Sequence, residues 1–260
     1  MTILDEIIAK RKYDVAQQKA IHPMSVFEKM PLFSREVISA KHAISQELAS
    51  GIIAEHKRRS PSKGIINANV NLFDVVLGYQ NAGVSCVSVL TEQTYFGGSL
   101  DDLLEAREIL DIPILRKDFM VDEFQILEAR AFGADFILLI AAALTQKEVR
   151  QFAQFAHSLD LEVLLEVHTR EELDMCCPEI DLVGVNNRNL KDFSVDIERS
   201  VQLAQAIPQE FVKITESGIS CVENVTYLKS HGFQGFLMGE NFMKHTNPGI
   251  ACADFIAALE

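Results

Sequence analysis

Short apolar segments alternate with longer amphipathic segments from residue 52 onward. The apolar segments, each of strand length, cover residues 52–54, 84–90, 112–115, 136–140, 163–167, 182–185, 211–214 and 236–238. Apolar side chains recur at helical spacing between them, over residues 100–110, 123–132, 147–159, 171–176 and 222–231. Capping residues support two of these helices, because Asp122 and Thr145 precede them and are followed three residues later by Gln125 and Glu148. The pattern predicts strands and helices in regular alternation.

This alternation predicts a fold of the α/β class. A strand, a helix and a further strand form a right-handed unit with parallel strands, and eight such units fit a (β/α)8 TIM barrel of about 250 residues. The chain has 260 residues. A doubly wound sheet would need fewer strands, and its dinucleotide-binding form would need a Gly-x-Gly-x-x-Gly motif after an early strand, which the sequence lacks. We therefore expect a single domain over residues 1–260, with the barrel over residues 48–260.

Residues 1–47 stand outside this repeat. Residues 2–20 have the pattern of one amphipathic helix, and residues 23–34 that of a connector. We expect this N-terminal helical extension to lie across one mouth of the barrel.

Polar residues follow nearly every predicted strand. In a TIM barrel the carboxyl ends of the strands meet at one face, where the active site lies. The residues at these ends are Glu55, Lys57, Thr91, Glu92, Lys117, Asp118, Glu166, Asn186, Asn187, Arg188, Glu216, Ser217, Gly218, Gly239 and Glu240. Any one of them alone is best explained as part of a strand-end ion pair, but their coincidence on one face favours catalysis.

Glu55 and Lys57 are the clearest pair among these residues. Side chains two positions apart on a strand share a face, so both should point the same way. A carboxylate and an ammonium group at the end of a buried strand are costly unless they are paired or used. Together with Lys117 at the end of the third strand, they predict acid–base chemistry on an anionic substrate.

Glycines after the last two strands predict a phosphate site. Gly218 and Gly239 would let backbone N–H groups approach phosphate oxygens closely, and barrels often bind phosphate at these two loops. Tight turns would explain either glycine alone, but the pair favours phosphate.

The polar loop at residues 60–64 (SPSKG) is a candidate lid and lacks the pattern of a nucleotide-binding P-loop. Phe96 and Phe119 at the same mouth fit ordinary packing and stacking on an aromatic substrate equally well.

Composition narrows the classes of function. The formal net charge is −13 without a basic tract, which argues against nucleic-acid binding. A hydrophobic fraction of 48% is enough for a sizeable core and excludes a disordered chain. The five cysteines form no Cys-x-x-Cys pair, as expected of reduced thiols in a cytoplasmic protein. The sequence has neither a signal-peptide pattern nor an apolar run of transmembrane length, so no membrane contact is expected.

The histidines carry a weaker signal than the carboxylates and lysines. His, Asp and Glu residues show no metal-ligand spacing, so a metal is not expected. His56 lies between Glu55 and Lys57 and should therefore point away from the barrel axis, toward a helix. His168 follows Glu166 by two residues and could reach the rim of the pocket, but a catalytic role is the less favoured interpretation.

Several segments together resemble one enzyme family. They are residues 53–64 (IAEHKRRSPSKG), 89–92 (VLTE), 95–99 (YFGGS), 112–119 (IPILRKDF), 184–188 (GVNNR), 215–219 (TESGI), 237–240 (LMGE) and 3–7 (ILDEI). In this order they are similar to the indole-3-glycerol-phosphate synthases of tryptophan biosynthesis. The resemblance implies a carboxy-lyase without a cofactor. Its substrate would be 1-(2-carboxyphenylamino)-1-deoxyribulose 5-phosphate, and its products indole-3-glycerol phosphate, CO₂ and water.

The resemblance also implies roles for single residues. Lys117 would be the general acid and Glu166 the base in the later proton removal, while Glu55 and Lys57 would hold the acid–base network and neutralise the substrate's charge. Asn186 and Ser217 would bind the sugar portion. Further substrate contacts would come from Ser60, Phe96, Phe119, Arg188 and Glu216, and phosphate contacts from the backbone at Gly218, Gly239 and Glu240. Neighbouring ammonium groups and partial burial would lower the pKa of Lys117.

Three positions depart from the pattern common in this family. His56 stands where an apolar or small residue is more frequent, Asn187 where serine or threonine is, and Thr215 where alanine is. None of these departures removes a catalytic group, so they bear on packing and rate rather than on the reaction.

Two other interpretations remain open. The first is another phosphate-binding barrel enzyme, such as phosphoribosylanthranilate isomerase or a Schiff-base aldolase that uses Lys117 or Lys213. The second is a non-catalytic barrel that binds a phosphorylated ligand, although two lysines and two glutamates at strand ends argue against it. In each case the expected ligand is a small phosphorylated molecule, and the expected assembly is a monomer or weak homodimer.

Overall fold

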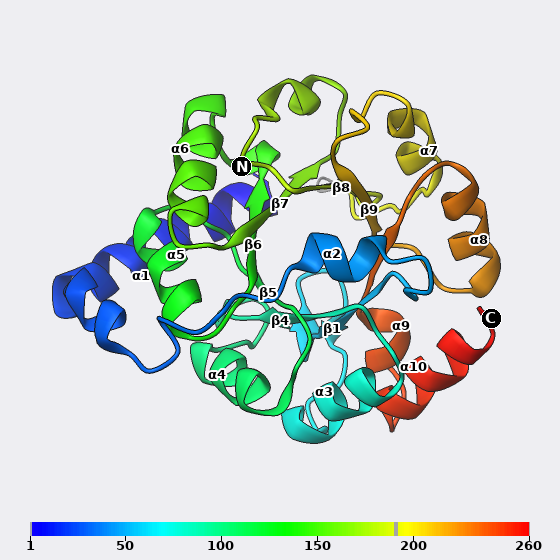
Figure 1. Ribbon diagram of the computed structural model, residues 1–260, viewed down its shortest axis with the longest axis horizontal. Helices are drawn as coiled ribbons and strands as arrows, with labels where there is room; N and C mark the ends of the chain where they lie inside the picture. The colour runs from blue at the N-terminus through cyan, green and yellow to red at the C-terminus, as the bar shows by residue number, and fades with distance from the viewer. Residues whose placement is uncertain (1, 190–191, 260) are drawn as a thin grey trace.

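Eight parallel strands close into a barrel in the computed structural model of the chain, which describes residues 2–189 and 192–259 (Figure 1). The strands are β1 (Ile52–His56), β4 (Cys86–Leu90), β5 (Ile114–Lys117), β6 (Phe136–Ile140), β7 (Glu162–Val167), β8 (Leu182–Asn186), β9 (Val212–Glu216) and β10 (Gly235–Met238). Each strand pairs with the next along the chain, and β1 closes the ring between β10 and β4. The predicted (β/α)8 TIM barrel is confirmed. Met1 and Glu260, the ends of the predicted domain, lie outside the described residues.

Helices cover the outside of the barrel (Figure 1). They are α3 (Leu72–Asn81), α4 (Leu100–Ile109), α5 (Glu123–Ala131), α6 (Gln146–His157), α7 (Glu198–Ala204), α8 (Val222–Ser230), α9 (Glu240–Met243) and α10 (Pro248–Ala257), with 3-10 turns η2 (Ala141–Ala143) and η3 (Glu171–Met175). The helix predicted over residues 171–176 is only the 3-10 turn η3. The chain turns to an extended conformation at Cys176, two residues before Pro178, which leaves no room for an α-helix.

Alternate strand residues pack into two separate layers. Ile53 and Leu115 belong to the apolar cluster inside the barrel. Ala54 and Ile114, their neighbours in sequence, pack in the layer between strands and helices. Because both faces of each strand are buried, the strands are read in the sequence as continuous apolar runs.

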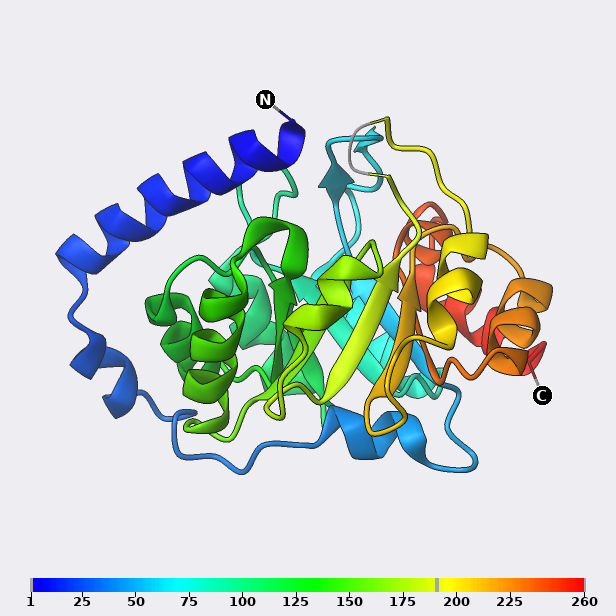
Figure 2. The same cartoon turned by 90° about the horizontal axis from the view of Figure 1, so that it is seen from above.

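The N-terminal extension reaches both ends of the barrel. Its elements are α1 (Ile3–Ile21), η1 (Met24–Lys29) and α2 (Ala40–Ser45). In Figure 2, α1 lies beside the mouth at the carboxyl ends of the strands, and α2 lies across the opposite mouth. Ala40 and Ile44 of α2 join the apolar cluster inside the barrel and close it from below. The prediction placed the extension across one mouth, whereas α1 lies beside one mouth and α2 covers the other.

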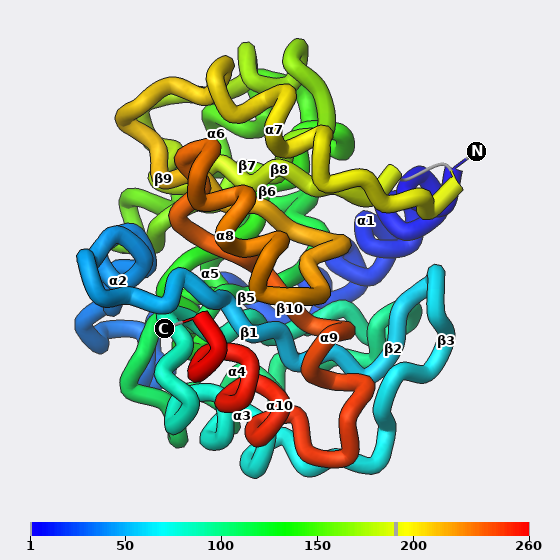
Figure 3. The backbone as a smooth tube through the Cα atoms, turned by 90° about the vertical axis from the view of Figure 1, so that its right-hand side faces the viewer, coloured from blue at the N-terminus to red at the C-terminus, as the bar shows by residue number. Residues whose placement is uncertain are grey.

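Strand register brings the polar strand ends to a common level. Glu55 pairs with Ser88, Lys117 with Leu90, and Glu166 with Ile140. The loop predicted as a lid forms a small hairpin of β2 (Arg59–Ser60) and β3 (Gly64–Ile65). This hairpin projects from the same end of the molecule as α1 (Figure 3). Glu55, Lys117 and Glu166 therefore lie at the mouth between the hairpin and α1.

Candidate active site

A cavity of about 480 Å³ lies at the carboxyl ends of the strands. Its lining includes every residue predicted for the site: Glu55, Lys57, Ser60, Phe96, Lys117, Phe119, Glu166, Asn186, Arg188, Glu216, Ser217, Gly218, Gly239 and Glu240. These residues are spread over more than 180 positions of the chain, and the barrel brings them together. The structure therefore places these residues at the location predicted for them, the carboxyl ends of the barrel strands.

Sequence reasoning missed the contribution of α1 to this cavity. Ile3, Leu4 and Ile7 line it, and together with Leu138 and Ile140 of β6 they supply apolar surface. The signal was present as apolar residues four apart at the start of an amphipathic helix. Such a pattern is usually explained by core packing, so it did not point to a substrate site.

Glu55 is held between two ammonium groups. Its Oε1 lies 2.5 Å from Nζ of Lys57, and its Oε2 lies 3.7 Å from Nζ of Lys117. Ser88 donates a long hydrogen bond of 3.5 Å to Oε2. Burial acts to raise the pKa of Glu55, but Lys57 and Lys117 outweigh it and the net pKa is lowered. Glu55 is therefore a fixed negative charge at the centre of the mouth.

Lys117 is surrounded by carboxylates. Its Nζ lies 3.3 Å from Oε2 of Glu216 in addition to the contact with Glu55. Burial acts to lower the pKa of Lys117, but the charges of Glu216, Glu55 and Glu166 outweigh it and raise the pKa above its ordinary value. The predicted lowering of this pKa was wrong, because three carboxylates from β1, β7 and β9 converge on the lysine and outweigh its burial.

The same crowding of carboxylates also raises the pKa of Glu216. Burial, and then the negative charge of Glu166, raise its pKa to about 8, although Lys117 acts against this. One of the converging carboxyl groups thus retains a proton near neutral pH.

Glu166 is oriented from the neighbouring strand. Nδ2 of Asn186 donates a hydrogen bond of 3.2 Å to Oε1 of Glu166. The other end of the Asn186 amide accepts a hydrogen bond of 2.9 Å from the backbone N–H of Arg188. The second bond fixes which way the amide points, so its NH₂ group faces the carboxylate.

The loops after β9 and β10 form the second polar end of the cavity. Ser217 and Gly218 adopt left-handed conformations with φ of 69° and 78°. At Gly239, a Cβ atom would lie 2.7 Å from Oε1 of Glu55, so only glycine fits beside that carboxylate without a shift. Lys63 and Arg188 approach the carboxylate of Glu240 to 3.2 Å and 3.9 Å, which gathers cations at this end.

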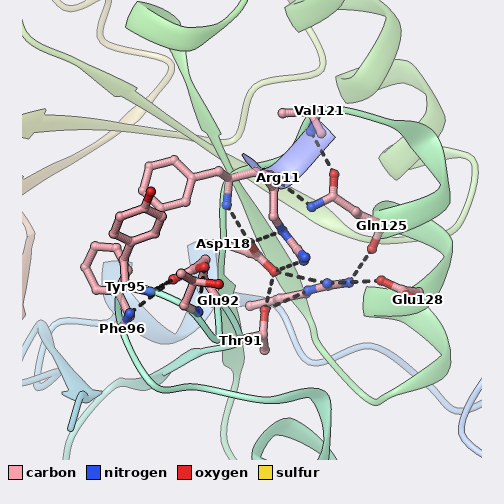
Figure 4. Close-up of polar contacts among 12 residues, drawn as sticks. Arg11, Thr91, Glu92, Tyr95, Phe96, Asp118, Val121, Gln125 and Glu128 are labelled. Atoms are coloured by element: carbon pink, nitrogen blue, oxygen red, sulfur yellow. Dashed lines mark hydrogen bonds and ion pairs between the residues drawn. The ribbon is translucent and has the colours of Figure 1, made fainter. Parts of the chain in front are cut away.

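A buried ionic network supports the loop that follows Lys117 (Figure 4). Arg11 of α1 binds Asp118 through two hydrogen bonds, Nε to Oδ1 at 2.9 Å and Nη2 to Oδ2 at 2.6 Å. Thr91 and Arg116 donate to the same carboxylate at 2.5 Å and 3.1 Å, and the backbone N–H of Phe119 donates to Oδ1 at 2.8 Å. These contacts on the Asp118 carboxylate hold the loop that follows Lys117 in place.

Two aromatic rings face each other at the mouth. The ring centroids of Phe96 and Phe119 are 5.9 Å apart. Glu92 holds the loop of Phe96 in place, because its carboxylate accepts the backbone N–H groups of Thr94, Tyr95 and Phe96 at 2.7–3.0 Å (Figure 4). Both rings are thus presented to the cavity by fixed loops.

Two of the three positions that depart from the family pattern contact each other. Nδ2 of Asn187 donates to Oγ1 of Thr215 at 3.0 Å, and the Ser200 hydroxyl lies within hydrogen-bond distance of both side chains. Asn187 also donates to the carbonyl oxygen of Ser217 at 3.0 Å, which connects this buried cluster to the site. The third, His56, is buried, and burial and the charge of Arg58 lower its pKa to about 4.

Within residues 2–189 and 192–259, His, Cys, Asp and Glu side chains form no group of three that could hold a metal ion. In the same part of the chain, none of the helices combines the length and apolar character needed to cross a bilayer.

Comparison with known proteins places the chain among named relatives. A sequence profile described as indole-3-glycerol phosphate synthase matches residues 4–255. The indole-3-glycerol phosphate synthase of Bacteroides thetaiotaomicron is 45% identical over 261 residues, covering 99% of each chain. That of Burkholderia multivorans is 42% identical over 254 residues, covering 95% of this chain and 96% of the relative.

Solved structures of other proteins share the fold of this chain. A mutant tryptophan synthase alpha-subunit from Pyrococcus furiosus superposes with a TM-score of 0.61 at 14% identity, covering 81% of this chain and 98% of that one. At this identity the likeness concerns the barrel fold alone. The family profile and the sequence relatives go further, and they show that the chain belongs to the indole-3-glycerol phosphate synthase family.

Proposed function

We propose that the charged side chains at the barrel mouth carry out three steps in one cavity: ring closure, decarboxylation and dehydration. The chain is an indole-3-glycerol phosphate synthase by family, and hence a lyase of tryptophan biosynthesis that acts on a phosphorylated small molecule. The observation that carries the mechanism is the placement of Lys117 among the carboxylates of Glu55, Glu166 and Glu216.

Lys117 is the proposed general acid for ring closure. A ring carbon of the carboxyphenylamino group attacks the ketone, a carbon–carbon bond forms, and the carbonyl electron pair moves onto oxygen. That oxygen takes a proton from the Lys117 ammonium group. The surrounding carboxylates keep Lys117 protonated when the substrate binds, which a general acid requires, and the same raised pKa makes the ammonium group a weaker acid until charge develops on the substrate oxygen. Glu55 and Lys57 hold the ammonium group in place and balance charge around it.

Glu166 is the proposed base for the final step. Loss of CO₂ leaves its bonding electrons in the ring system, and the hydroxyl then departs as water after it takes a second proton from the ammonium group of Lys57, which also lines the cavity. Glu166 removes the proton whose loss completes the indole. Its hydrogen bond from Asn186 supports this role, since a base must be held within reach of one proton.

The two ends of the cavity fit the two ends of this substrate. Phe96, Phe119 and the apolar side chains of α1 would contact the aromatic ring. Backbone groups at Gly218, Gly239 and Glu240 would bind the phosphate with help from Arg188. Asn186, Ser217, Ser60 and Glu216 line the space between these ends and would contact the sugar portion and the acid–base centre.

Indole fluorescence tests the proposal directly. The purified chain, without added metal or cofactor, is mixed with 1-(2-carboxyphenylamino)-1-deoxyribulose 5-phosphate. The chain contains no tryptophan, so the background is low. We expect a rise in fluorescence that Lys117→Ala and Glu166→Gln abolish while circular dichroism shows both variants folded. A flat trace from the folded wild-type chain would contradict the proposal.

The Schiff-base alternative makes a different prediction. An aldolase would be trapped covalently on its lysine by borohydride, with a ketose or aldehyde substrate. Nζ of Lys213, one of the two candidate lysines, donates a hydrogen bond of 2.6 Å to the carbonyl oxygen of Ala204, beside α7 and away from the cavity. This contact disfavours Lys213 and leaves Lys117 as the lysine to examine.

We further propose that the chain is one domain over residues 1–260, with the barrel over residues 48–260, and that it is a monomer or weak homodimer in the cytoplasm. Light scattering across a hundredfold range of concentration tests the assembly. A tight dimer at the lowest concentration would contradict it.

A further inference from the structure

A buried histidine lies directly behind the proposed base. Nε2 of His168 is 3.6 Å from Oε1 of Glu166, and Nδ1 is 3.8 Å from Oε2 of Glu172. The side chain is only 8% exposed, and neither ring nitrogen has a hydrogen-bond partner in the described part of the chain. An imidazole buried without partners is costly, so its position between two carboxylates requires an explanation.

The arrangement fits a charged imidazole better than a neutral one. A neutral imidazole has one N–H group, whereas the protonated ring offers one N–H group to each carboxylate. The ionisable groups that face the ring are Glu166 on β7, Glu172 on η3 and Glu216 on β9, of which Glu216 holds a proton near neutral pH, while Lys117 acts on Glu166 from the cavity side. Burial acts to lower the pKa of His168, but Glu172 and Glu166 outweigh it and raise the pKa.

Glu172 anchors the histidine from the side away from the cavity. Its Oε2 accepts the backbone N–H of His168 at 2.6 Å, so the oxygen that faces the ring is itself fixed. Burial acts to raise the pKa of Glu172, but the contacts with His168 outweigh it and lower the pKa. Glu172 therefore presents a negative charge to the ring at neutral pH.

We propose that His168 is a positioning residue, whose protonated ring bridges Glu172 and Glu166 and keeps the Glu166 carboxylate aimed into the cavity. This rests on the role proposed above for Glu166 and adds the residues that hold that base ready. His168 itself does not line the described cavity, so it acts through Glu166 and not on the substrate.

Histidine titration by NMR tests the coupling without any turnover. The chain has seven histidines, and His168→Gln identifies the resonance that disappears. We expect the pKa of His168 to lie above 6.5 in the wild-type chain and to fall by about one unit in Glu166→Gln, because an opposite charge within 4 Å is removed. An unchanged His168 pKa in Glu166→Gln would overturn the proposal.

Kinetics test the consequence for the base. We expect His168→Gln to lower kcat about tenfold with KM within about twofold, and to remove the fall in kcat that accompanies loss of the His168 proton at higher pH. Glu172→Gln should move this fall to lower pH, because it takes away a charge that raises the pKa of His168, and the control His157→Gln should leave it in place. A His168→Gln enzyme with the wild-type pH profile would refute the positioning role. An inactive wild-type chain would instead contradict the proposed function, so the two failures are distinguishable.

Discussion

The ammonium group of Lys117 on β5 lies 3.3 Å from the carboxylate of Glu216 on β9, across the interior of the barrel. Glu55 approaches the same ammonium group to 3.7 Å, and Glu166 adds a third negative charge nearby. Like charges this close cannot all remain ionised in a buried site. The lysine therefore keeps its proton, and Glu216 also holds one up to a pKa of about 8.

Glu216 should make the stability of the fold depend on pH. Its pKa is about 8 in the folded chain against an ordinary value of 4.5. Between these values the folded state binds a proton that the unfolded state releases, so stability is highest at low pH and falls as pH rises toward 8. The slope for one group is at most about 1.4 kcal/mol per pH unit. We expect Glu216→Gln to remove this dependence.

Urea unfolding at several values between pH 5 and pH 8.5 measures the effect. The quantity to follow is the free energy of unfolding of the wild-type chain minus that of Glu216→Gln, which should decrease as pH rises. Glu105→Gln, at an exposed position of α4, is the control and should run parallel to the wild type. A constant difference across the range would show that Glu216 is ionised throughout.

Local patterns were sufficient to locate the strands and to place the candidate residues at one mouth. Nearly every apolar run ends where polar residues begin, so Glu55, Glu166 and Glu216 could be assigned to the same mouth without knowledge of the packing. This works because parallel strands in a barrel share one direction, and a residue's place along its strand fixes the end at which it lies.

Local sequence patterns could not predict contacts between segments that are distant in the chain. The charge state of Lys117 depends on carboxylates from three other strands, and their distances follow only from barrel closure and side-chain conformation. The pairing of Arg11 with Asp118 joins residues 107 positions apart. Similarly, Ile3 and Ile7 line the cavity only because α1 is anchored beside that mouth. Such facts are set by tertiary packing, which a single sequence does not display.

The anchoring of α1 should depend strongly on Arg11. Asp118 is fully buried, and Arg11→Met would remove two of its hydrogen bonds while leaving Thr91 and Arg116 in place. We expect a loss of about 2–3 kcal/mol in the free energy of unfolding, less than for a buried carboxylate left with no partner. Urea unfolding at pH 7 measures it.

Lys19 provides a matched control for the same helix. It pairs with Asp122 at 2.8 Å, but both side chains are largely solvent-accessible. Exposed pairs contribute about 0–1 kcal/mol, so Lys19→Met should change stability little. Equal losses in Arg11→Met and Lys19→Met would mean that burial of the Asp118 network does not matter to the docking of α1.

Asn187 and Thr215 should be energetically coupled. Their hydrogen bond of 3.0 Å is fully buried and shares Ser200 as a common partner. Contacting residues in one network show coupling energies of about 0.5–3 kcal/mol. In a double-mutant cycle of Asn187→Ala and Thr215→Ala, we expect the double variant to lose less stability than the sum of the single losses. Additive losses would indicate that the two side chains act independently.

Gly239→Ala should separate activity from stability. The backbone at Gly239 has φ of −122°, outside the left-handed region that favours glycine, so the main effect of the substitution comes from the volume of the methyl group. The added methyl group would lie 2.7 Å from Oε1 of Glu55 and must displace that carboxylate, which in turn contacts Lys57 and Lys117. We expect kcat to fall about tenfold or more, with a small change in melting temperature.

Gly232→Ala is the matched control, because φ is 90° there and the nearest atom to the new methyl group is 4.0 Å away, far from the cavity. It should lower stability by about 1 kcal/mol through backbone strain and leave kcat unchanged. If Gly239→Ala turns over substrate at the wild-type rate, the position of Glu55 is not critical to the reaction, and its proposed part in holding Lys117 must be given up.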